Sequence, residues 1–328
     1  MIPFIVAELS ANHLQDYERA VRLVEAAAES GADAVKLQCW DRLVIAERRI
    51  ESGPWAGRGM AELYAECKTP WSWFKPLFSR AKSLDMVGFS SAFDWESVEF
   101  LVNEGCPILK IASAEITDHN LIAVAAKTGL PLMMSTGMAD EDEIDAALMV
   151  AKSAGCDDLT LLHCTSAYPA PAGDCNLLAM ADLDGRYGVD VGLSDHTLGW
   201  TAATAATALN AVVIEKHLTL ARSDGGPDAG FSAEPHEFAA MVKACREVSE
   251  MLGDGRRGPR ASEMPTLPLR RGLWVTQPIR QGEVLTSLNL RAYRPATTIP
   301  AYLLTAYWGR VASRDLKPGD DLTDADAV

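Results

Sequence analysis

The sequence predicts an α/β protein, a (β/α)8 TIM barrel followed by a small β-rich domain. Three observations predict the barrel: short apolar runs recur, helix-like segments separate them, and the repeat fills about 250 residues, the usual size of this fold. Continuous apolar runs are typical of parallel strands covered on both faces. A doubly wound open sheet is the alternative, but the regular repetition favours closure. The predicted strands are residues 4–7, 34–37, 86–89, 108–111, 132–134, 159–162, 189–193 and 212–214.

The segments between these runs have helical apolar spacing. Residues 16–30 and 140–154 are each followed directly by a glycine, and residues 96–103 are followed by Glu104 and Gly105; acidic residues lie near the start of the first and the last of these segments. Acids in a first turn and glycine after a last turn are helix start and stop signals. Residues 40–70 form a longer insertion, rich in Trp and Gly, which we interpret as a surface loop, with a lid as the alternative.

The pattern changes after residue 253. The stretch 254–265 has a linker composition, and we expect it to join a barrel of residues 1–253 to a small domain of residues 266–328. That last segment has short apolar runs between turns and carries eight Lys or Arg against six Asp or Glu. It is therefore slightly basic, while the rest of the chain is strongly acidic.

Composition excludes several classes of protein. The net charge of −15 over 328 residues argues against binding to a nucleic-acid backbone. No apolar run approaches the roughly 20 residues of a membrane span, and the first residues do not resemble a signal peptide. The seven Cys are scattered without a CxxC pair, as expected of reduced thiols. We therefore expect a cytoplasmic protein with neither nucleic-acid nor membrane partners.

Two lysines are embedded in predicted strands. In a (β/α)8 barrel the chemistry lies at the carboxyl ends of the strands. Lys36 and Lys110 lie there within apolar surroundings, where an uncompensated charge is costly. They either pair with barrel carboxylates or, with the hydroxyls that end other strands, form a site for phosphate and carboxylate groups. Those hydroxyls are Ser113, Ser135 and Ser194.

His196 and His217 end neighbouring predicted strands, so their rings could converge on a divalent metal. Asp195 and Glu215 are available as acceptors that orient the two rings. The alternative is that both histidines are structural.

Glu8 and Glu115 are the candidate acid–base pair, and the alternative is that they only neutralise the lysines. Loops that bind nucleoside triphosphates or dinucleotides, serine-hydrolase elbows and zinc-finger spacings are absent from the sequence.

Several motifs together resemble the sialic acid synthase family. They are AELSANH at 7–13, GADAVKLQ at 31–38, STG at 135–137, SDHT at 194–197 and EKH at 215–217. The end of the chain resembles that family's antifreeze-like (SAF, β-clip) domain, through QGE at 281–283, RP at 294–295 and GRVA at 309–312. Within the family, AELSANH, CTSAYPA at 164–170 and GGPD at 225–228 are most similar to pseudaminic acid synthases. Departures from the family pattern occur at Leu14, Gln15, Ala92 and Ala296.

This resemblance implies condensation of phosphoenolpyruvate with an acetamido sugar, giving a nine-carbon 2-keto acid and phosphate. The implied sugar is 2,4-diacetamido-2,4,6-trideoxy-L-altrose, and N-acetylneuraminate or legionaminic acid synthesis is the alternative. The resemblance also implies a domain-swapped homodimer, in which the SAF domain presents an arginine to the sugar of the other subunit.

The implied site residues fall into four groups. Matching positions give His196 and His217 as ligands of Mn²⁺ or Mg²⁺, and Lys36, Lys110, Ser113, Ser135 and Ser194 as phosphoenolpyruvate contacts. Gln38, Asp228 and Arg294 match sugar contacts, and Glu8, Glu115 and Tyr168 match catalytic positions.

Two rival functions remain from the residues alone. One is a Schiff-base aldolase in which Lys36 or Lys110 is the nucleophile. The other is a non-catalytic carbohydrate- or ice-binding protein, against which the dense polar set at the strand ends argues.

Overall fold

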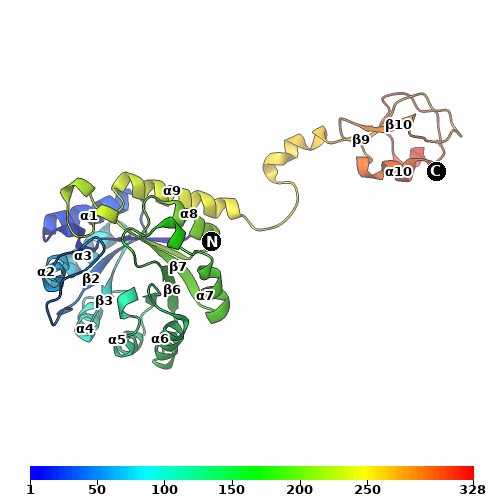
Figure 1. Ribbon diagram of the computed structural model, residues 1–328. Coiled ribbons are helices and arrows are strands. Elements are labelled where there is room, and N and C mark those ends of the chain that lie inside the picture. Colours follow the sequence, from blue (N-terminus) through cyan, green and yellow to red (C-terminus); the bar gives the residue numbers. More distant parts are fainter. The chain divides into compact units, whose positions relative to one another are not determined.

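The computed structural model describes residues 1–328, which form two compact units, Met1–Gly253 and Asp254–Val328 (Figure 1). Each unit has an apolar core of its own.

The first unit is a closed barrel of eight parallel strands, as predicted, and the open-sheet alternative is wrong. Each strand pairs with the next along the chain, and β1 closes the barrel against β8 with Phe4 opposite Val213. Most strands continue beyond the apolar runs into the polar residues that follow, because interior partners satisfy those side chains. The strands are β1 (Phe4–Glu8), β2 (Ala34–Cys39), β3 (Val87–Ala92), β4 (Leu109–Ile111), β5 (Leu132–Ser135), β6 (Leu159–Cys164), β7 (Asp190–Asp195) and β8 (Val213–His217).

Helices surround the barrel (Figure 1). The predicted start signals are confirmed: the carboxylates of Asp16 and Asp140 each accept a backbone N–H of the first turn that follows. Asp94, which was not predicted, does the same for the helix that starts at Trp95. The helices are α1 (Tyr17–Glu29), α2 (Met60–Cys67), α3 (Phe74–Ser83), α4 (Trp95–Asn103), α5 (His119–Ala126), α6 (Glu141–Ser153), α7 (Ala179–Tyr187), α8 (Thr201–Ala208) and α9 (Pro235–Leu252). Short 3-10 turns are Ser10–His13, Trp71–Trp73, Ser113–Glu115, Ala172–Asp174, Arg222–Asp224 and Ala229–Phe231.

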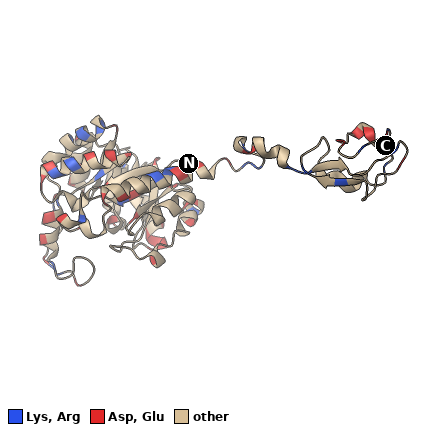
Figure 2. Cartoon of the chain, turned by 90° about the horizontal axis from the view of Figure 1, so that it is seen from above, with Lys and Arg blue, Asp and Glu red and all other residues tan.

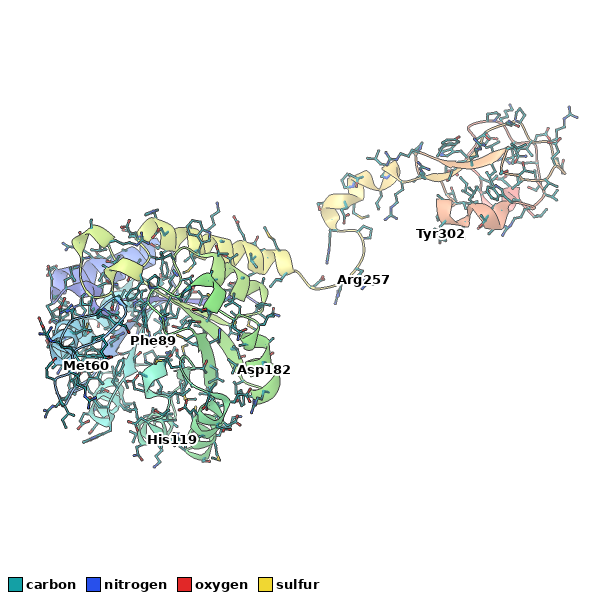
Figure 3. All side chains as sticks on the ribbon, in the orientation of Figure 1. Met60, Phe89, His119, Asp182, Arg257 and Tyr302 are labelled. Carbon is teal, nitrogen blue, oxygen red and sulfur yellow. The ribbon has the colours of Figure 1, made fainter.

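The main core lies between the strands and these helices. Phe89 on β3 is fully buried in the interior of the first unit (Figure 3). Lysines, arginines and acidic residues are spread together over the outer helices (Figure 2). None of the helices combines the length and the apolar character that a membrane crossing requires.

The insertion after β2 is more ordered than the surface loop expected from its composition. A hairpin bridges Arg49 and Gly59, helix α2 follows, and Trp40 and Leu63 belong to a small apolar cluster of their own. The same cluster includes Ala11, so the insertion packs against the segment that follows β1.

The second unit is small and β-rich. Strands β9 (Gly272–Val275) and β10 (Leu290–Tyr293) pair antiparallel, and isolated bridges connect the remaining chain. Its core includes Leu273, Leu285 and Leu322. The 3-10 turn Ala261–Leu269 includes the last residues of the stretch 254–265 expected as a linker. The other elements are two 3-10 turns, Ala301–Leu303 and Asp324–Asp326, and α10 (Leu304–Tyr307).

Candidate active site

A buried ion cluster joins three neighbouring strands at the carboxyl end of the barrel. The Nζ of Lys36 on β2 lies 2.7 Å from Glu8 Oε2 on β1 and 3.1 Å from Glu215 Oε1 on β8. All three residues are almost fully buried. Lys36 is therefore neutralised by barrel carboxylates, which was one of the two alternatives for it.

Burial and ion pairing act against each other in this cluster. Burial raises the pKa of Glu8 to about 7, because the nearby lysine offsets only part of the desolvation. The attraction of Lys36 and Lys110 outweighs burial at Glu215 and lowers its pKa to about 2. At neutral pH, Glu215 is thus the ionised partner of Lys36, and Glu8 is poised to gain or lose a proton.

Lys110 on β4 has a different environment. Its Nζ lies 2.5 Å from Ser135 Oγ and 3.2 Å from the carbonyl oxygen of Ile111, and it forms no ion pair with Glu115 or another carboxylate. The residue is 1% exposed, and this burial lowers its pKa to about 8. A cation so placed lacks a protein counter-ion, so an anionic ligand would compensate its charge.

The three predicted serines have different partners, and only Ser135 contacts a lysine. Ser135 contacts Lys110, whereas the Ser194 hydroxyl donates to Glu215 Oε1 at 2.9 Å. Ser113 Oγ accepts the backbone N–H of Gly137 at 3.1 Å. A Cβ at position 137 would approach the Ser166 Oγ to 2.3 Å and the Ser113 Oγ to 2.8 Å, so a larger residue there would displace these hydroxyls.

The two predicted metal ligands converge. The ring centroids of His196 and His217 lie 5.4 Å apart. His196 Nδ1 contacts the carbonyl oxygen of Thr165 at 3.0 Å, which leaves the lone pair of Nε2 free. His217 Nδ1 is buried without a hydrogen-bond partner, and burial together with nearby positive charge keeps the pKa of this ring well below its usual range.

The expectation that Asp195 and Glu215 orient these rings is wrong. Asp195 Oδ2 lies 2.7 Å from Lys216 Nζ, and its Oδ1 accepts from Thr197. Glu215 is engaged by Lys36 and Ser194. Side chains alternate along a strand, so Asp195 and Lys216 face away from the barrel interior.

The remaining predicted barrel residues lie at the same end. Glu115, in a 3-10 turn after β4, has a buried Oε2 without a partner, and burial raises its pKa to about 7. The ring of Tyr168 lies 4.2 Å from that of His196, and burial raises its pKa. Asp228 accepts from the hydroxyl of Ser10, and Gln38 shares the strand face of Lys36 by the two-residue alternation of β2.

Unsatisfied polar atoms gather among these residues. Oε2 of Glu115, Oε2 of Glu215 and Nδ1 of His217 are buried and lack hydrogen-bond partners. Buried polar groups are almost always paired, so such a gathering indicates a place where a ligand supplies the missing partners.

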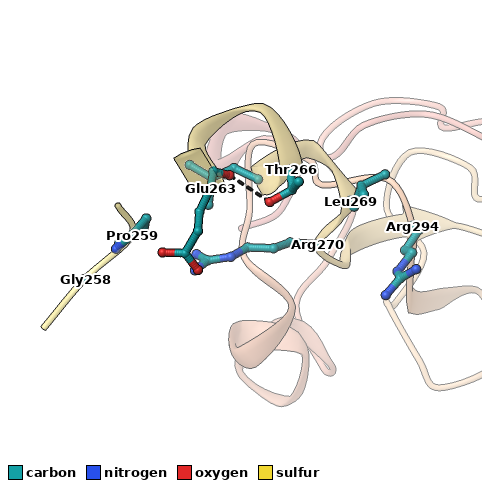
Figure 4. Close-up of a pocket in the computed structure, with 8 residues that line it drawn as sticks. Gly258, Pro259, Glu263, Thr266, Leu269, Arg270 and Arg294 are labelled. Carbon is teal, nitrogen blue, oxygen red and sulfur yellow. Dashed lines mark hydrogen bonds between the residues drawn. The ribbon is translucent and has the colours of Figure 1, made fainter. Parts of the chain in front are cut away.

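Arg294 belongs to the second unit. There it lines a pocket of about 480 Å³ together with Glu263, Thr266, Leu269 and Arg270 (Figure 4).

Several site residues escaped the sequence prediction. Ser91 Oγ lies 3.2 Å from Lys36 Nζ, and its place at the end of a predicted strand was a usable signal. The ring of Trp55 lies 5.3 Å from that of Tyr168, and Cys164 Sγ lies 3.7 Å from His196 Nδ1. No local pattern marks Trp55, because its contact arises between the insertion and a distant loop.

Known families and proteins match most of the chain. Residues 23–257 match the NeuB family and residues 270–328 match the SAF domain. The pseudaminic acid synthase of Helicobacter pylori is 39% identical over 99% of this chain and 97% of its own. The N,N'-diacetyllegionaminic acid synthase of Campylobacter jejuni is 36% identical over 95% of this chain and 96% of its own.

A solved structure is similar as well. The N-acetylneuraminic acid (sialic acid) synthetase of Leptospira borgpetersenii, in complex with citrate, superposes with a TM-score of 0.72 at 32% identity. That similarity covers 81% of this chain and 90% of the other. The chain therefore belongs to the NeuB family, the enzyme family that also includes the pseudaminic acid synthases, and carries a SAF domain at its carboxyl end.

Proposed function

We propose that this enzyme condenses phosphoenolpyruvate with 2,4-diacetamido-2,4,6-trideoxy-L-altrose and water to give pseudaminic acid and phosphate. The observation that carries the proposal is the buried ammonium of Lys110, which contacts Ser135 and pairs with no carboxylate. An anion with several oxygen acceptors fits this arrangement.

The lysines and serines would hold phosphoenolpyruvate. Lys110 would bind one anionic end of the substrate, with Ser113 and Ser135 as hydroxyl donors beside it. The charge of Lys36 is offset by Glu8 and Glu215. Lys36 would therefore contribute less to substrate binding than Lys110, and it also stabilises the fold. The result is a fixed position for the enol carbon that attacks the sugar aldehyde.

Two carboxylates are suited to move protons. In the proposed reaction the enol carbon bonds to the aldehyde carbon, water adds to the former enol carbon, and phosphate leaves by C–O cleavage. We assign the activation of that water to Glu115, whose pKa of about 7 is matched to neutral pH. Glu8, with a similar pKa, is a second proton acceptor, and Tyr168 offers a protonated hydroxyl next to His196.

A divalent cation, Mn²⁺ or Mg²⁺, fits the pair of imidazoles. His217 is neutral with an unpartnered nitrogen, and the backbone contact of His196 fixes its ring orientation. No group of three or more His, Cys, Asp or Glu side chains is arranged to hold a metal ion, so water and substrate oxygens would complete the coordination. Such an ion would supply Lewis acidity toward the sugar aldehyde oxygen.

The sugar side of the site would include Asp228 and Gln38, and we propose that Arg294 of the SAF domain reaches the sugar bound in a second subunit. This arrangement requires a domain-swapped homodimer. We further propose a cytoplasmic location, because phosphoenolpyruvate is a metabolite of that compartment and the cysteines are all free.

Product mass tests the proposal directly. The full chain with Mn²⁺, phosphoenolpyruvate and a panel of acetamido sugars should release phosphate and a 2-keto acid whose mass equals that of the altrose derivative plus pyruvate. If the enzyme turned over only the legionaminic acid precursor, or only N-acetylmannosamine, and not the altrose derivative, the sugar would have to be reassigned. Absence of phosphate release with every sugar would refute the reaction.

Lys110 also favours one rival, because a buried lysine with a pKa lowered to about 8 is suited to Schiff-base chemistry. Borohydride treatment in the presence of pyruvate separates the two functions. A Schiff-base aldolase forms a stable adduct that mass spectrometry detects, whereas the proposed condensation gives none.

A further inference from the structure

The insertion after β2 contains a hairpin whose turn includes Trp55. The Ile50 N–H donates to the Arg58 carbonyl oxygen at 3.0 Å, and the Gly57 N–H donates to the Ile50 carbonyl oxygen at 2.8 Å. Gly57 has a φ of +83°, a backbone conformation that favours glycine. The turn therefore holds Trp55 at a defined position.

From that turn Trp55 reaches the candidate active site. Its ring lies 5.3 Å from Tyr168 and 6.0 Å from Phe231. Its indole Nε1 donates to the carbonyl oxygen of Pro227 at 2.8 Å, next to Asp228. The insertion thus contributes a side chain to the barrel end.

These aromatic rings form a continuous wall that extends to the two imidazoles. Tyr168 and Phe231 lie 4.9 Å apart. Tyr168 lies 4.2 Å from His196, and Phe231 lies 5.2 Å from His217. We define the aromatic wall as Trp55, Tyr168 and Phe231. It is apolar, whereas the lysines and carboxylates of the same site are polar.

The proposed sugar has apolar parts that suit such a wall. Its C6 is a methyl group, and its two acetamido groups end in methyls. A sugar with a hydroxyl at C6 would bury that hydroxyl against aromatic carbon without a hydrogen-bond partner. An apolar pocket discriminates against an added hydroxyl by no more than about 100-fold.

We infer that Trp55 is a specificity-determining residue, which selects 6-deoxy sugars by closing the aromatic wall over the C6 methyl group. This inference rests on the proposed function and goes beyond it, because it assigns sugar selection to a residue of the insertion.

The test compares two sugars at saturating phosphoenolpyruvate. For the full chain we expect kcat/KM for 2,4-diacetamido-2,4,6-trideoxy-L-altrose to exceed that for its 6-hydroxy analogue, 2,4-diacetamido-2,4-dideoxy-L-altrose, by about 10- to 100-fold on account of the wall. Trp55→Ala should reduce this ratio by about 10-fold or more, through a higher KM for the 6-deoxy sugar. Trp55→Phe keeps an aromatic face and should retain most of the preference.

Trp95→Ala is the matched control, because Trp95 is 59% exposed and belongs to α4 rather than to the insertion. Circular dichroism and Tm of each variant check that the fold is kept. A Trp55→Ala ratio equal to that of the wild type and of Trp95→Ala would overturn the inference while leaving the proposed function intact. A wild type that turns over neither sugar would refute the proposed function, and the inference with it.

Discussion

Replacing Lys36 by Met tests the buried ion cluster. The change removes the ammonium that lies 2.7 Å from Glu8 and 3.1 Å from Glu215, while methionine fills much of the same volume. The side chains of all three residues are at most 5% exposed, so water cannot replace the lost partner. Breaking a buried pair by removing one member costs about 3–5 kcal/mol.

The expected Tm shift follows from that free energy. For a unit of this size, 1 kcal/mol changes Tm by about 2–4 °C, so Lys36→Met should lower the barrel transition by about 6–20 °C at pH 8. Differential scanning calorimetry of the full chain provides the measurement. The double variant Lys36→Met with Glu215→Gln should recover much of the loss, because it removes the orphaned charge.

The loss of stability that Lys36→Met shows relative to the wild type, here called its deficit, should depend on pH with a defined sign. In the wild type the pKa of Glu215 is lowered to about 2, so this group stays ionised at pH 5. Without Lys36, burial would raise the pKa of Glu215 in the folded state above its value in the unfolded chain. In a Glu8→Gln background, which removes the other carboxyl group of the cluster that titrates near pH 7, the folded variant takes up an extra proton as pH falls. Its deficit relative to the Glu8→Gln parent therefore shrinks between pH 8 and pH 5, by at most about 1.4 kcal/mol per pH unit.

Lys110→Met is the matched control. Lys110 is also buried and lies at the same barrel end, but it pairs with no carboxylate, and burial lowers its pKa to about 8. Removing it leaves no carboxylate without a contact partner, so its Tm should equal or exceed that of the wild type. Equal losses in the two variants, or no loss in Lys36→Met, would refute the assignment of different roles to the two lysines.

Three further predictions concern catalysis. Glu115→Gln should lower kcat by about 10²- to 10⁴-fold. Because the base acts when ionised and burial raises its pKa to about 7, wild-type kcat should rise with pH up to about 7. A variant that keeps the kcat of the wild type would contradict the assignment. His217→Ala should abolish both the binding of Mn²⁺, measured by electron paramagnetic resonance, and the release of phosphate, while the circular dichroism spectrum stays unchanged. Retained ion binding would exclude this residue as a ligand. Arg294→Ala should raise the KM for the sugar by about 10- to 100-fold, as expected for loss of a charged hydrogen bond; an equal rise in the KM for phosphoenolpyruvate would argue against a sugar contact.

Local sequence signals were enough to predict the barrel. Each strand contains a short apolar run, and each of the helices predicted from capping signals begins and ends as those signals indicate. A strand buried on both faces needs a continuous apolar run, and the free N–H groups at a helix start need a nearby acceptor side chain. Both requirements are met by residues close together in the sequence. The polar residues at the strand ends follow from the same periodicity, so most of the candidate site could be named before its geometry was known.

Closure of the barrel decided what each of those residues does. Lys36 and Lys110 have similar sequence surroundings, yet only Lys36 is ion-paired, because β1 and β8 become neighbours when the barrel closes and bring Glu8 and Glu215 to it. The neighbour of Lys110 on β5 supplies a serine instead. Strand alternation likewise separates Glu215 from Lys216, which pairs with Asp195 on the outer face. Trp55 meets Tyr168 only because the insertion folds over the barrel end, and contacts between segments so far apart in the chain leave no periodic trace in the sequence.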